Sequence, residues 1–278
     1  MPPSLSDAAG VFAALWRPRI DEALASSVAR VPEGQLREAC AHGLLGPGKR
    51  LRPLLVLASC EALGGKGADA LPAAVAVEEV HAFSLIHDDL PCLDDDDERR
   101  GRPTVHVLYG EATALLAGDA LLALALGTLA DAGAAWSPRA VARLAEATWS
   151  GLVPGQVLDL EARLPDARAD LEEIHLLKTG RLMEAACVLG GLVAGGEGSS
   201  LESLALYGRD LGLAFQLADD LIDAEMPGED PTSWLWVHGR EATLAAGEAA
   251  VARAVAMAET LGSQVLSDMA HAAFHRRV

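Results

Sequence analysis

The chain has 278 residues, of which 51% are hydrophobic and 4% aromatic, and its formal net charge is −18. An acidic balance of this size argues against nucleic acid as a partner, because phosphate backbones need a basic surface. The four cysteines form no C-x-x-C pair, which argues against a disulfide framework or a zinc site and favours a reducing compartment.

The composition predicts an all-α protein. Alanine and leucine, the strongest helix formers, are abundant, and β-branched runs with period two are nearly absent. Glycine and proline divide the chain into helices, and no linker is long enough to separate domains. We expect a single domain over residues 1–278, with helices over Asp7–Val31, Glu33–Gly43, Arg52–Leu63, Pro72–Leu90, Glu111–Ala132, Ser137–Gly151, Gln156–Ala162, Leu171–Val193, Ser199–Ala224 and Glu241–Phe274.

No segment is expected to span a membrane. The most hydrophobic stretch, residues 112–130, is interrupted by Gly118, Asp119 and Gly127 and is richer in alanine than in leucine, which favours a buried core helix. The first ten residues contain no basic region followed by an apolar core. We therefore expect no secretory signal and a cytoplasmic location.

Two aspartate pairs lie inside apolar stretches of the chain. Asp88-Asp89 follows Ser84-Leu85-Ile86-His87, and Asp219-Asp220 lies between Phe215-Gln216-Leu217-Ala218 and Leu221-Ile222-Asp223. Burying adjacent carboxylates among apolar side chains is unfavourable unless cations neutralise them. Mg²⁺ takes oxygen ligands and usually binds through a few carboxylates together with substrate phosphates. The two pairs predict one cavity with a metal-binding carboxylate wall on each side.

The two clusters differ in their expected local structure. Gln216, Asp219 or Asp220, and Asp223 recur at helical spacing and share one face of a helix. Pro91 cannot continue the first helix, so Asp94 is expected in the following turn.

Three alternatives exist for the acidic runs. A solvated surface is the alternative for the run from Asp94 to Asp97 taken alone. An EF-hand loop is excluded because Arg99 occupies the position of the turn glycine. A class I terpene cyclase is excluded because Asp223 and Pro227 occupy positions of its second metal motif.

The basic residues form clusters of their own. Two of the three lysines lie in Gly48-Lys49-Arg50-Leu51-Arg52-Pro53 and Leu177-Lys178-Thr179-Gly180, and Arg99-Arg100-Gly101-Arg102 follows the first aspartate cluster. A lone basic run in an acidic protein is usually a salt-bridged surface. Basic clusters combined with two carboxylate clusters predict a diphosphate site bound by arginine forks and by metal.

These motifs together resemble the trans-isoprenyl diphosphate synthases, the polyprenyl synthetase family that includes farnesyl and geranylgeranyl diphosphate synthases. The resemblance covers roughly residues 40–225, in order and at fitting spacing. It rests on Gly48-Lys49-Arg50-Leu51-Arg52-Pro53, Glu78-x-x-His81-x-x-Ser84-Leu85-Ile86-His87-Asp88-Asp89-Leu90-Pro91-x-x-Asp94, Arg99-Arg100-Gly101, Gly155-Gln156-x-x-Asp159-Leu160, Lys178-Thr179-Gly180 and Phe215-Gln216-x-x-Asp219-Asp220-x-x-Asp223.

The resemblance implies an isoprenoid synthase helical bundle around a central cavity, a homodimer, and head-to-tail condensation of isopentenyl diphosphate with an allylic diphosphate. It implies about three Mg²⁺ ions with substrate bound, acting as Lewis acid and template. The implied metal ligands are Asp88, Asp89, Asp94, Asp219 and Asp223. The implied catalytic residues are Asp88, Asp89, Asp94, Lys178, Asp219 and Asp220, although Asp220 could instead face a neighbouring helix.

The resemblance also implies two sets of substrate-binding residues. Arg99, Lys178, Thr179 and Gln216 support the allylic diphosphate, and Lys49, Arg52, His81 and Arg100 hold isopentenyl diphosphate. A buried structural histidine is the alternative for His81.

Chain length is assigned by the same resemblance to Phe83 and Ser84. Phe83 lies five residues before Asp88, about 7.5 Å deeper along a helix, where its ring could cap a growing prenyl tail. An aromatic residue there, with the longer spacing from Asp89 to Asp94, predicts the fifteen-carbon farnesyl product. Geranylgeranyl diphosphate is the alternative product, and plain core packing is the alternative role for Phe83.

One region departs from the family pattern. Residues 224–239 contain no lysine, Glu229 stands where the first diphosphate-binding lysine is usual, and Arg240 stands in the place of the second. We expect weaker binding, a shifted substrate preference, or a loop that orders differently on ligand binding, with Arg240 still able to bind phosphate. A non-catalytic regulatory partner of another synthase is an alternative. An all-α metal phosphohydrolase, suggested by His87-Asp88, leaves the second aspartate cluster unexplained.

Overall fold

The computed structural model describes residues 7–164, 170–223 and 233–275, and within these ranges the chain is α-helical apart from one short hairpin. This confirms the all-α class. The elements in chain order are α1 (Asp7–Val28), α2 (Gln35–Leu44), α3 (Leu51–Ala62), η1 (Gly67–Ala70), α4 (Leu71–Asp88), β1 (Glu98–Arg99), β2 (Arg102–Pro103), α5 (Val105–Tyr109), α6 (Glu111–Asp131), α7 (Ser137–Ala147), η2 (Thr148–Leu152), α8 (Val153–Ala162), α9 (Leu171–His175), η3 (Leu176–Gly180), α10 (Arg181–Val193), α11 (Ser199–Asp223), α12 (Trp234–His238), α13 (Arg240–Thr260) and α14 (Gln264–Phe274).

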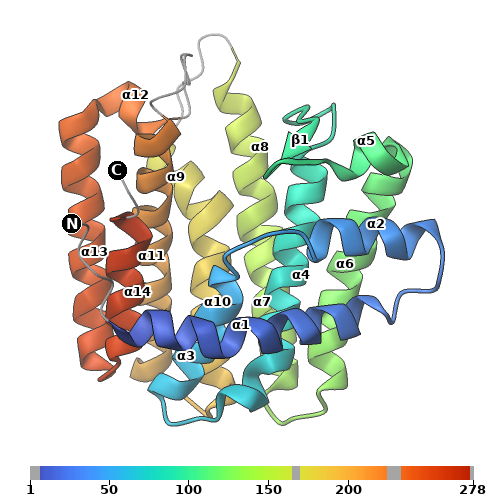
Figure 1. Ribbon diagram of the computed structural model, residues 1–278. Helices are drawn as coiled ribbons and strands as arrows, with labels where there is room; N and C mark the ends of the chain where they lie inside the picture. Colours follow the sequence, from blue (N-terminus) through green and yellow to red (C-terminus); the bar gives the residue numbers. More distant parts are fainter. Residues whose placement is uncertain (1–6, 165–169, 224–232, 276–278) are drawn as a thin grey trace.

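The long helices form a bundle with α4 and α10 at its centre (Figure 1). Helix α4 packs against α6 and α3, and α10 packs against α3 and α11, which in turn packs against α13. Helix α1 crosses the front of the bundle, and the hairpin, α5 and α12 lie at its upper end in Figure 1. The largest apolar core cluster contains side chains of α1–α7, α10, α11, α13 and α14, and the buried apolar residues of α8 and α9 form a separate small cluster. The single domain over residues 1–278 stays a prediction.

The sequence of α4 explains its position at the centre of the bundle. Pro72 lies in its first turn, where a missing N–H costs no hydrogen bond, and most of its side chains are buried. Gly118 lets α6 pack closely against it, because a Cβ at this glycine would overlap the ring of His87. Pro91 prevents the helix from continuing, and α4 ends at Asp88, two residues before the expected end at Leu90.

Helix α6 matches the apolar stretch at residues 112–130. Among the described helices it alone has the length and apolarity of a membrane span, and 33% of its most apolar window is buried. Its face with Ala114, Ala117 and Leu121 is fully buried in the bundle. A core helix of a soluble protein meets the same criteria.

Several expected boundaries were wrong, each for a local reason. The expected helix 241–274 divides at Gly262, which takes φ +67°, and the Ser263 side chain then accepts a hydrogen bond from the amide of Leu266 to begin α14. The expected break between Gly151 and Gln156 is absent, because α7 continues through the π-helical turn η2 into α8. The hairpin and α12 were not predicted, since each is only a few residues long.

Candidate functional site

The first aspartate cluster is built by the end of α4 and the turn after it. The amide of Asp94 donates to the carbonyl of Asp88 at 2.8 Å, and Asp95 takes φ +56°, so the chain folds back toward the helix. The hairpin then brings Arg99 against the first pair, with Arg99 Nε 2.5 Å from Asp89 Oδ1. Asp88, Asp89 and Asp94 therefore lie together, as the spacing predicted.

The electrostatics of Asp88 connect this cluster to η3. Burial raises the pKa of Asp88 to about 6, the positive charge of Lys178 lowers it, and the negative charge of Asp94 raises it. Burial also raises the pKa of Asp89, against the opposing effect of Arg99. A cation bound near Asp88 and Asp89 would therefore stabilise their ionised form, which burial disfavours.

A network of ion pairs that includes Asp159 of α8 links the first aspartate cluster to Lys178. Lys178 Nζ lies 2.9 Å from Asp159 Oδ2, and Arg163 contacts both Asp159 Oδ2 at 2.7 Å and Asp94 Oδ1 at 2.9 Å. Asp159 lies in the Gly155-Gln156-x-x-Asp159-Leu160 motif, but the sequence predicted no function for it. Arg163 was not predicted as a site residue. Both residues connect the first aspartate cluster to Lys178.

The second aspartate cluster lies on α11. Thr179 Oγ1 donates to Gln216 Oε1 at 3.1 Å, which brings η3 to this helix. Asp219 is half-buried. Burial lowers the pKa of Arg52 to about 10, and the negative charge of Asp219 opposes this effect, so Asp219 lies in electrostatic reach of the basic side of the site. Asp223 ends α11, and its side chain lies outside the described part of the chain.

Asp220 has a different environment from Asp219. Its Oδ2 accepts a hydrogen bond from the amide of Trp234 at 2.7 Å, at the start of α12, and its Oδ1 accepts one from Gln216 at 3.4 Å. It is buried, at 8% exposure. The geometry matches the alternative in which Asp220 faces a neighbouring helix.

The basic side of the site is formed by α3, α4 and the loop before β2. Arg52 Nη1 lies 3.2 Å from His81 Nε2, and Arg100 Nη1 donates to the carbonyl of Pro47 at 2.7 Å. Burial, reinforced by the charges of Arg52, Arg100, Arg99 and Arg50, lowers the pKa of His81 well below its usual value. His81 is therefore a neutral acceptor for Arg52.

Two further cations of the first basic motif differ in exposure. Lys49 is exposed in the turn before α3. Arg50 takes φ +53° and is buried, where it pairs with Asp21 at 2.8 Å and with Glu78 at 3.2 Å. Arg50 thus holds the turn in place instead of facing a ligand.

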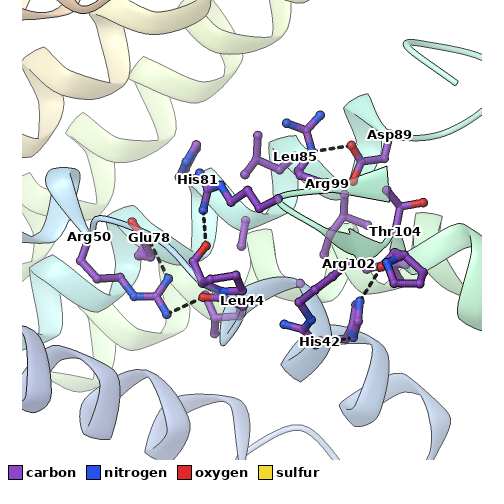
Figure 2. Close-up of a pocket in the computed structure, with 18 residues that line it drawn as sticks. His42, Leu44, Arg50, Glu78, His81, Leu85, Asp89, Arg99, Arg102 and Thr104 are labelled. Atoms are coloured by element: carbon purple, nitrogen blue, oxygen red, sulfur yellow. Dashed lines mark hydrogen bonds and ion pairs between the residues drawn. The ribbon is translucent and has the colours of Figure 1, made fainter. Parts of the chain in front are cut away.

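A pocket opens between the end of α2, the middle of α4 and the hairpin (Figure 2). His81 and Leu85 line it from α4 and Asp89 from just after this helix, and Arg99 contacts Asp89 at its upper rim in the view. Two residues that sequence reasoning missed, His42 and Arg102, pair across it at 2.9 Å. The run of arginines from Arg99 to Arg102 was the available signal for Arg102.

The two residues assigned to chain length lie on different faces of α4. Phe83 is buried, and its ring packs edge-on against His87 with centroids 5.0 Å apart. Ser84 precedes Asp88 by one helical turn and shares its face, and its hydroxyl donates to the carbonyl of His81 at 2.9 Å. Both assignments stay predictions.

The residues present fit a hard divalent cation that is bound together with substrate. Among the residues with described side chains, no three Asp, Glu, His or Cys groups converge closely enough to hold a metal unaided. Carboxylate oxygens are the donors that Mg²⁺ prefers, and its remaining positions are usually filled by water and substrate phosphates. Within the same residues, Arg52 Nε and Gln156 Nε2 are buried donors with no hydrogen-bond partner, which suits an anionic ligand.

The segment that departs from the family is described only in part. Glu229 lies outside the described residues. Arg240 is exposed in the first turn of α13. Trp234 packs between two histidines, with ring centroids 6.3 Å from His175 and 4.6 Å from His238.

Comparisons with known proteins agree with this geometry. The family model for polyprenyl synthetase matches residues 33–231. The chain is 47% identical over 220 residues to geranylgeranyl pyrophosphate synthase 7, chloroplastic, of Arabidopsis thaliana, covering 76% of this chain and 63% of that protein. It is 47% identical over 215 residues to the heterodimeric geranylgeranyl pyrophosphate synthase large subunit 1 of the same plant, covering 73% and 58%. The chain thus spans about 60% of the length of these relatives.

Solved structures extend the similarity to the whole fold. An FPP/GFPP synthase from Zymomonas mobilis superposes with a TM-score of 0.85 at 36% identity, covering 94% of this chain and 97% of that one. A geranyltransferase from Legionella pneumophila gives 0.88 at 30% identity, covering 97% and 98%. These neighbours confirm the isoprenoid synthase bundle. From the matched family model, the shared fold and the two aspartate clusters, we conclude that the chain belongs to the polyprenyl synthetase family.

Proposed function

We propose that the protein is a short-chain trans-prenyltransferase that condenses isopentenyl diphosphate with an allylic diphosphate. The observation that carries the proposal is that η3 contacts the surroundings of both aspartate clusters. Lys178 Nζ lies 2.9 Å from Asp159 Oδ2, which Arg163 connects to Asp94 of the first cluster, and Thr179 Oγ1 donates to Gln216 Oε1 on the helix of the second cluster. A diphosphate with its metal ions needs this combination of carboxylates and cations.

In the proposed mechanism the two aspartate clusters would hold Mg²⁺, through Asp88, Asp89 and Asp94 on one side and Asp219 and Asp223 on the other. When bound, Mg²⁺ supplies Lewis-acid stabilisation of the departing diphosphate. Asp220, whose carboxylate caps α12, would fix the end of α11 beside Asp219.

The basic residues divide between the two substrates. Lys178, Thr179 and Arg99 would bind the allylic diphosphate, with Gln216 orienting Thr179. Lys49, Arg52 and Arg100 would bind isopentenyl diphosphate. Neutral His81 would orient Arg52 without adding a charge. Since the released diphosphate can accept the final proton, the reaction requires no side-chain base.

We propose farnesyl diphosphate as the product, with geranylgeranyl diphosphate as the second candidate. The buried ring of Phe83, five residues before Asp88, supports the shorter product. The edge-on packing of this ring against His87, and the small Ser84 on the Asp88 face, favour the longer one. The two plant relatives carry geranylgeranyl in their names, and the Zymomonas neighbour is titled an FPP/GFPP synthase.

We also propose a homodimer. Side chains of α5 and α6 present exposed apolar surface, with Val107 and Leu108 about half exposed and Leu115 and Leu116 equally so. Contiguous exposed apolar surface is typical of protein interfaces. One relative is the large subunit of a heterodimer, so a second, different subunit is the alternative.

A cytoplasmic location is proposed from the cysteines. Cys40, Cys60, Cys92 and Cys187 are free thiols, and three of them are buried, which suits a reducing compartment. Relatives named as chloroplastic make a plastid the alternative.

The proposal is tested by incubating the protein with Mg²⁺, isopentenyl diphosphate and dimethylallyl, geranyl or farnesyl diphosphate, followed by product analysis. Elongation of at least one primer is expected. Asp219→Asn should lose about a hundredfold in rate because it removes charge beside the reacting diphosphate. A protein without elongation, which instead raises the rate of a separate synthase, would support the regulatory role.

A further inference from the structure

The segment that carries Lys178 and Thr179 is a π-helical turn. This turn, η3, joins α9 to α10, with Lys178 half-buried and Thr179 and Gly180 buried. Single π-helical turns inside α-helices are frequent at functional sites. Because η3 packs against α8 on one side and α11 on the other, both helices determine its position.

Gly155 on α8 admits the backbone of this turn. A Cβ at Gly155 would overlap the backbone nitrogen of Lys178 and would lie 2.7 Å from the Cα of Lys178 and 2.8 Å from the carbonyl carbon of Leu177. Real Cβ atoms essentially never come within 3.0 Å of such atoms. Since backbone atoms cannot rotate away, any side chain at Gly155 displaces η3 from α8.

Gly212 on α11 likewise leaves room for the backbone of η3. A Cβ there would lie 2.7 Å from the Cα of Gly180 and 3.3 Å from its nitrogen. Four residues before each of these glycines, Gly151 in η2 and Gly208 on α11 continue the close contact. A Cβ at Gly151 would lie 2.7 Å from the Cβ of Arg181, and one at Gly208 would lie 2.7 Å from the Cα of Glu184.

Each of these helices also supplies a polar acceptor one turn after its glycine. Asp159 follows Gly155 by four residues and accepts from Lys178 Nζ at 2.9 Å. Gln216 follows Gly212 by four residues and accepts from Thr179 Oγ1 at 3.1 Å. Residues four apart lie on the same helical face, so one face of each helix holds both the backbone and a side chain of η3.

We infer that Gly155 with Asp159, and Gly212 with Gln216, are positioning pairs that set the place and direction of Lys178 and Thr179 for the allylic diphosphate. The glycines fix the distance of η3 from α8 and α11, and the acceptors orient the two side chains. The inference rests on the proposed function, because it assigns Lys178 and Thr179 to the allylic substrate.

The test compares Gly155→Ala and Gly212→Ala with Gly247→Ala. Gly247 lies on α13, where an added Cβ would overlap the ring of Phe274, so this variant reports the effect of crowding away from η3. Thermal unfolding, kcat, and KM for the allylic and for isopentenyl diphosphate are measured for each variant.

Displacement of a binding residue by a fraction of an ångström raises the KM of the substrate it binds. We expect Gly155→Ala and Gly212→Ala to raise the allylic KM about tenfold or more and to change the isopentenyl KM less than about twofold. Gly247→Ala should lower the unfolding temperature without changing either KM. If the two site variants lower the unfolding temperature but leave both KM values unchanged, the glycines serve packing alone and the inference is overturned.

A measurement without substrate separates this inference from the proposed function. Amide hydrogen exchange of residues 176–180 should be about tenfold faster in Gly155→Ala than in Gly247→Ala, because only the first variant loosens η3. Equal exchange rates would overturn the inference, whether or not the protein elongates a primer. A wild-type protein without elongation, but with this local increase in exchange, would overturn only the proposed function.

Discussion

Arg163 Nη1 lies 2.9 Å from Asp94 Oδ1, so an arginine pairs with a carboxylate that the family pattern assigns to metal. The same guanidinium contacts Asp159, the partner of Lys178. A cation that binds Asp94 must therefore compete with Arg163 or share the carboxylate with it. This relationship leads to the first prediction.

Arg163→Gln should lower the Mg²⁺ concentration that half-saturates elongation, because it removes the competing charge at Asp94. The arginine is 40% exposed, so solvent limits the effect to about 1 kcal/mol, or up to about fivefold. The Mg²⁺ dependence of elongation and of thermal unfolding checks it, with the exposed Arg139→Gln on α7 as control. A higher Mg²⁺ requirement in Arg163→Gln would mean that Arg163 assists metal binding.

His81 is predicted to act as a neutral acceptor for Arg52. Since burial and nearby arginines lower its pKa well below 6.5, its ring should not titrate between pH 6 and 8 in an NMR titration. His81→Gln retains a neutral acceptor and should keep the isopentenyl KM within about threefold, and His81→Ala should raise it about tenfold. A wild-type ring that takes up a proton near pH 6.5 would contradict this role.

Glu79 makes the stability of the protein depend on pH. It is fully buried, its carboxylate accepts from Ser27 Oγ at 2.6 Å, and burial raises its pKa to about 7. Because the folded-state pKa lies above the unfolded value near 4.5, the stability from protonated Glu79 is fully present below pH 4.5. It is lost as the pH rises through about 7.

Glu79→Gln should therefore be more stable than the wild type at pH 8, by roughly 3 kcal/mol at most, at 1.36 kcal/mol per pKa unit. Urea unfolding at pH 5 and pH 8 measures the difference. The exposed Glu248→Gln on α13 serves as control and should show the pH dependence of the wild type. The account of Glu79 is wrong if Glu79→Gln follows the same pH dependence as the control.

Phe83→Ala should lengthen the product from farnesyl to geranylgeranyl diphosphate if the ring ends the chain pocket. Ser84→Phe provides the converse change on the Asp88 face and should shorten the product. Chain lengths are read by mass spectrometry after elongation from dimethylallyl diphosphate, whose first elongation product is shorter than farnesyl diphosphate. An unchanged product in Phe83→Ala, with a shorter one in Ser84→Phe, would move the end of the pocket to the Ser84 face.

The sequence predicted the features that depend on residue type and local spacing. Clustered aspartates in apolar surroundings predicted both walls of the site, and the structure ends α4 just before Pro91, at the first of them. Glycine and proline marked most helix boundaries. The break at Gly262 was missed because a lone glycine within a helical pattern does not reveal whether it takes positive φ.

Features that depend on how helices meet could not be predicted. Asp219 and Asp220 are neighbours in sequence, but their side chains point about 100° apart on α11. Asp219 therefore faces the site, and Asp220 accepts a hydrogen bond from the first amide of α12. The contact of Gly155 with Lys178 joins α8 to η3, and no local pattern indicates that crossing. The salt bridge of Arg163 with Asp94 spans 69 residues of chain for the same reason.

The elongation assay tests the central claim most directly, which is that the two aspartate clusters act on one diphosphate. The wild type, Asp88→Asn, Asp219→Asn and the double variant are incubated with Mg²⁺, isopentenyl diphosphate and geranyl diphosphate, and the products are quantified. The account predicts elongation by the wild type, a loss of about a hundredfold in each single variant, and little further loss in the double variant, since residues that act as a unit are not additive. A wild type that elongates no primer, or single variants that retain full activity, would contradict it.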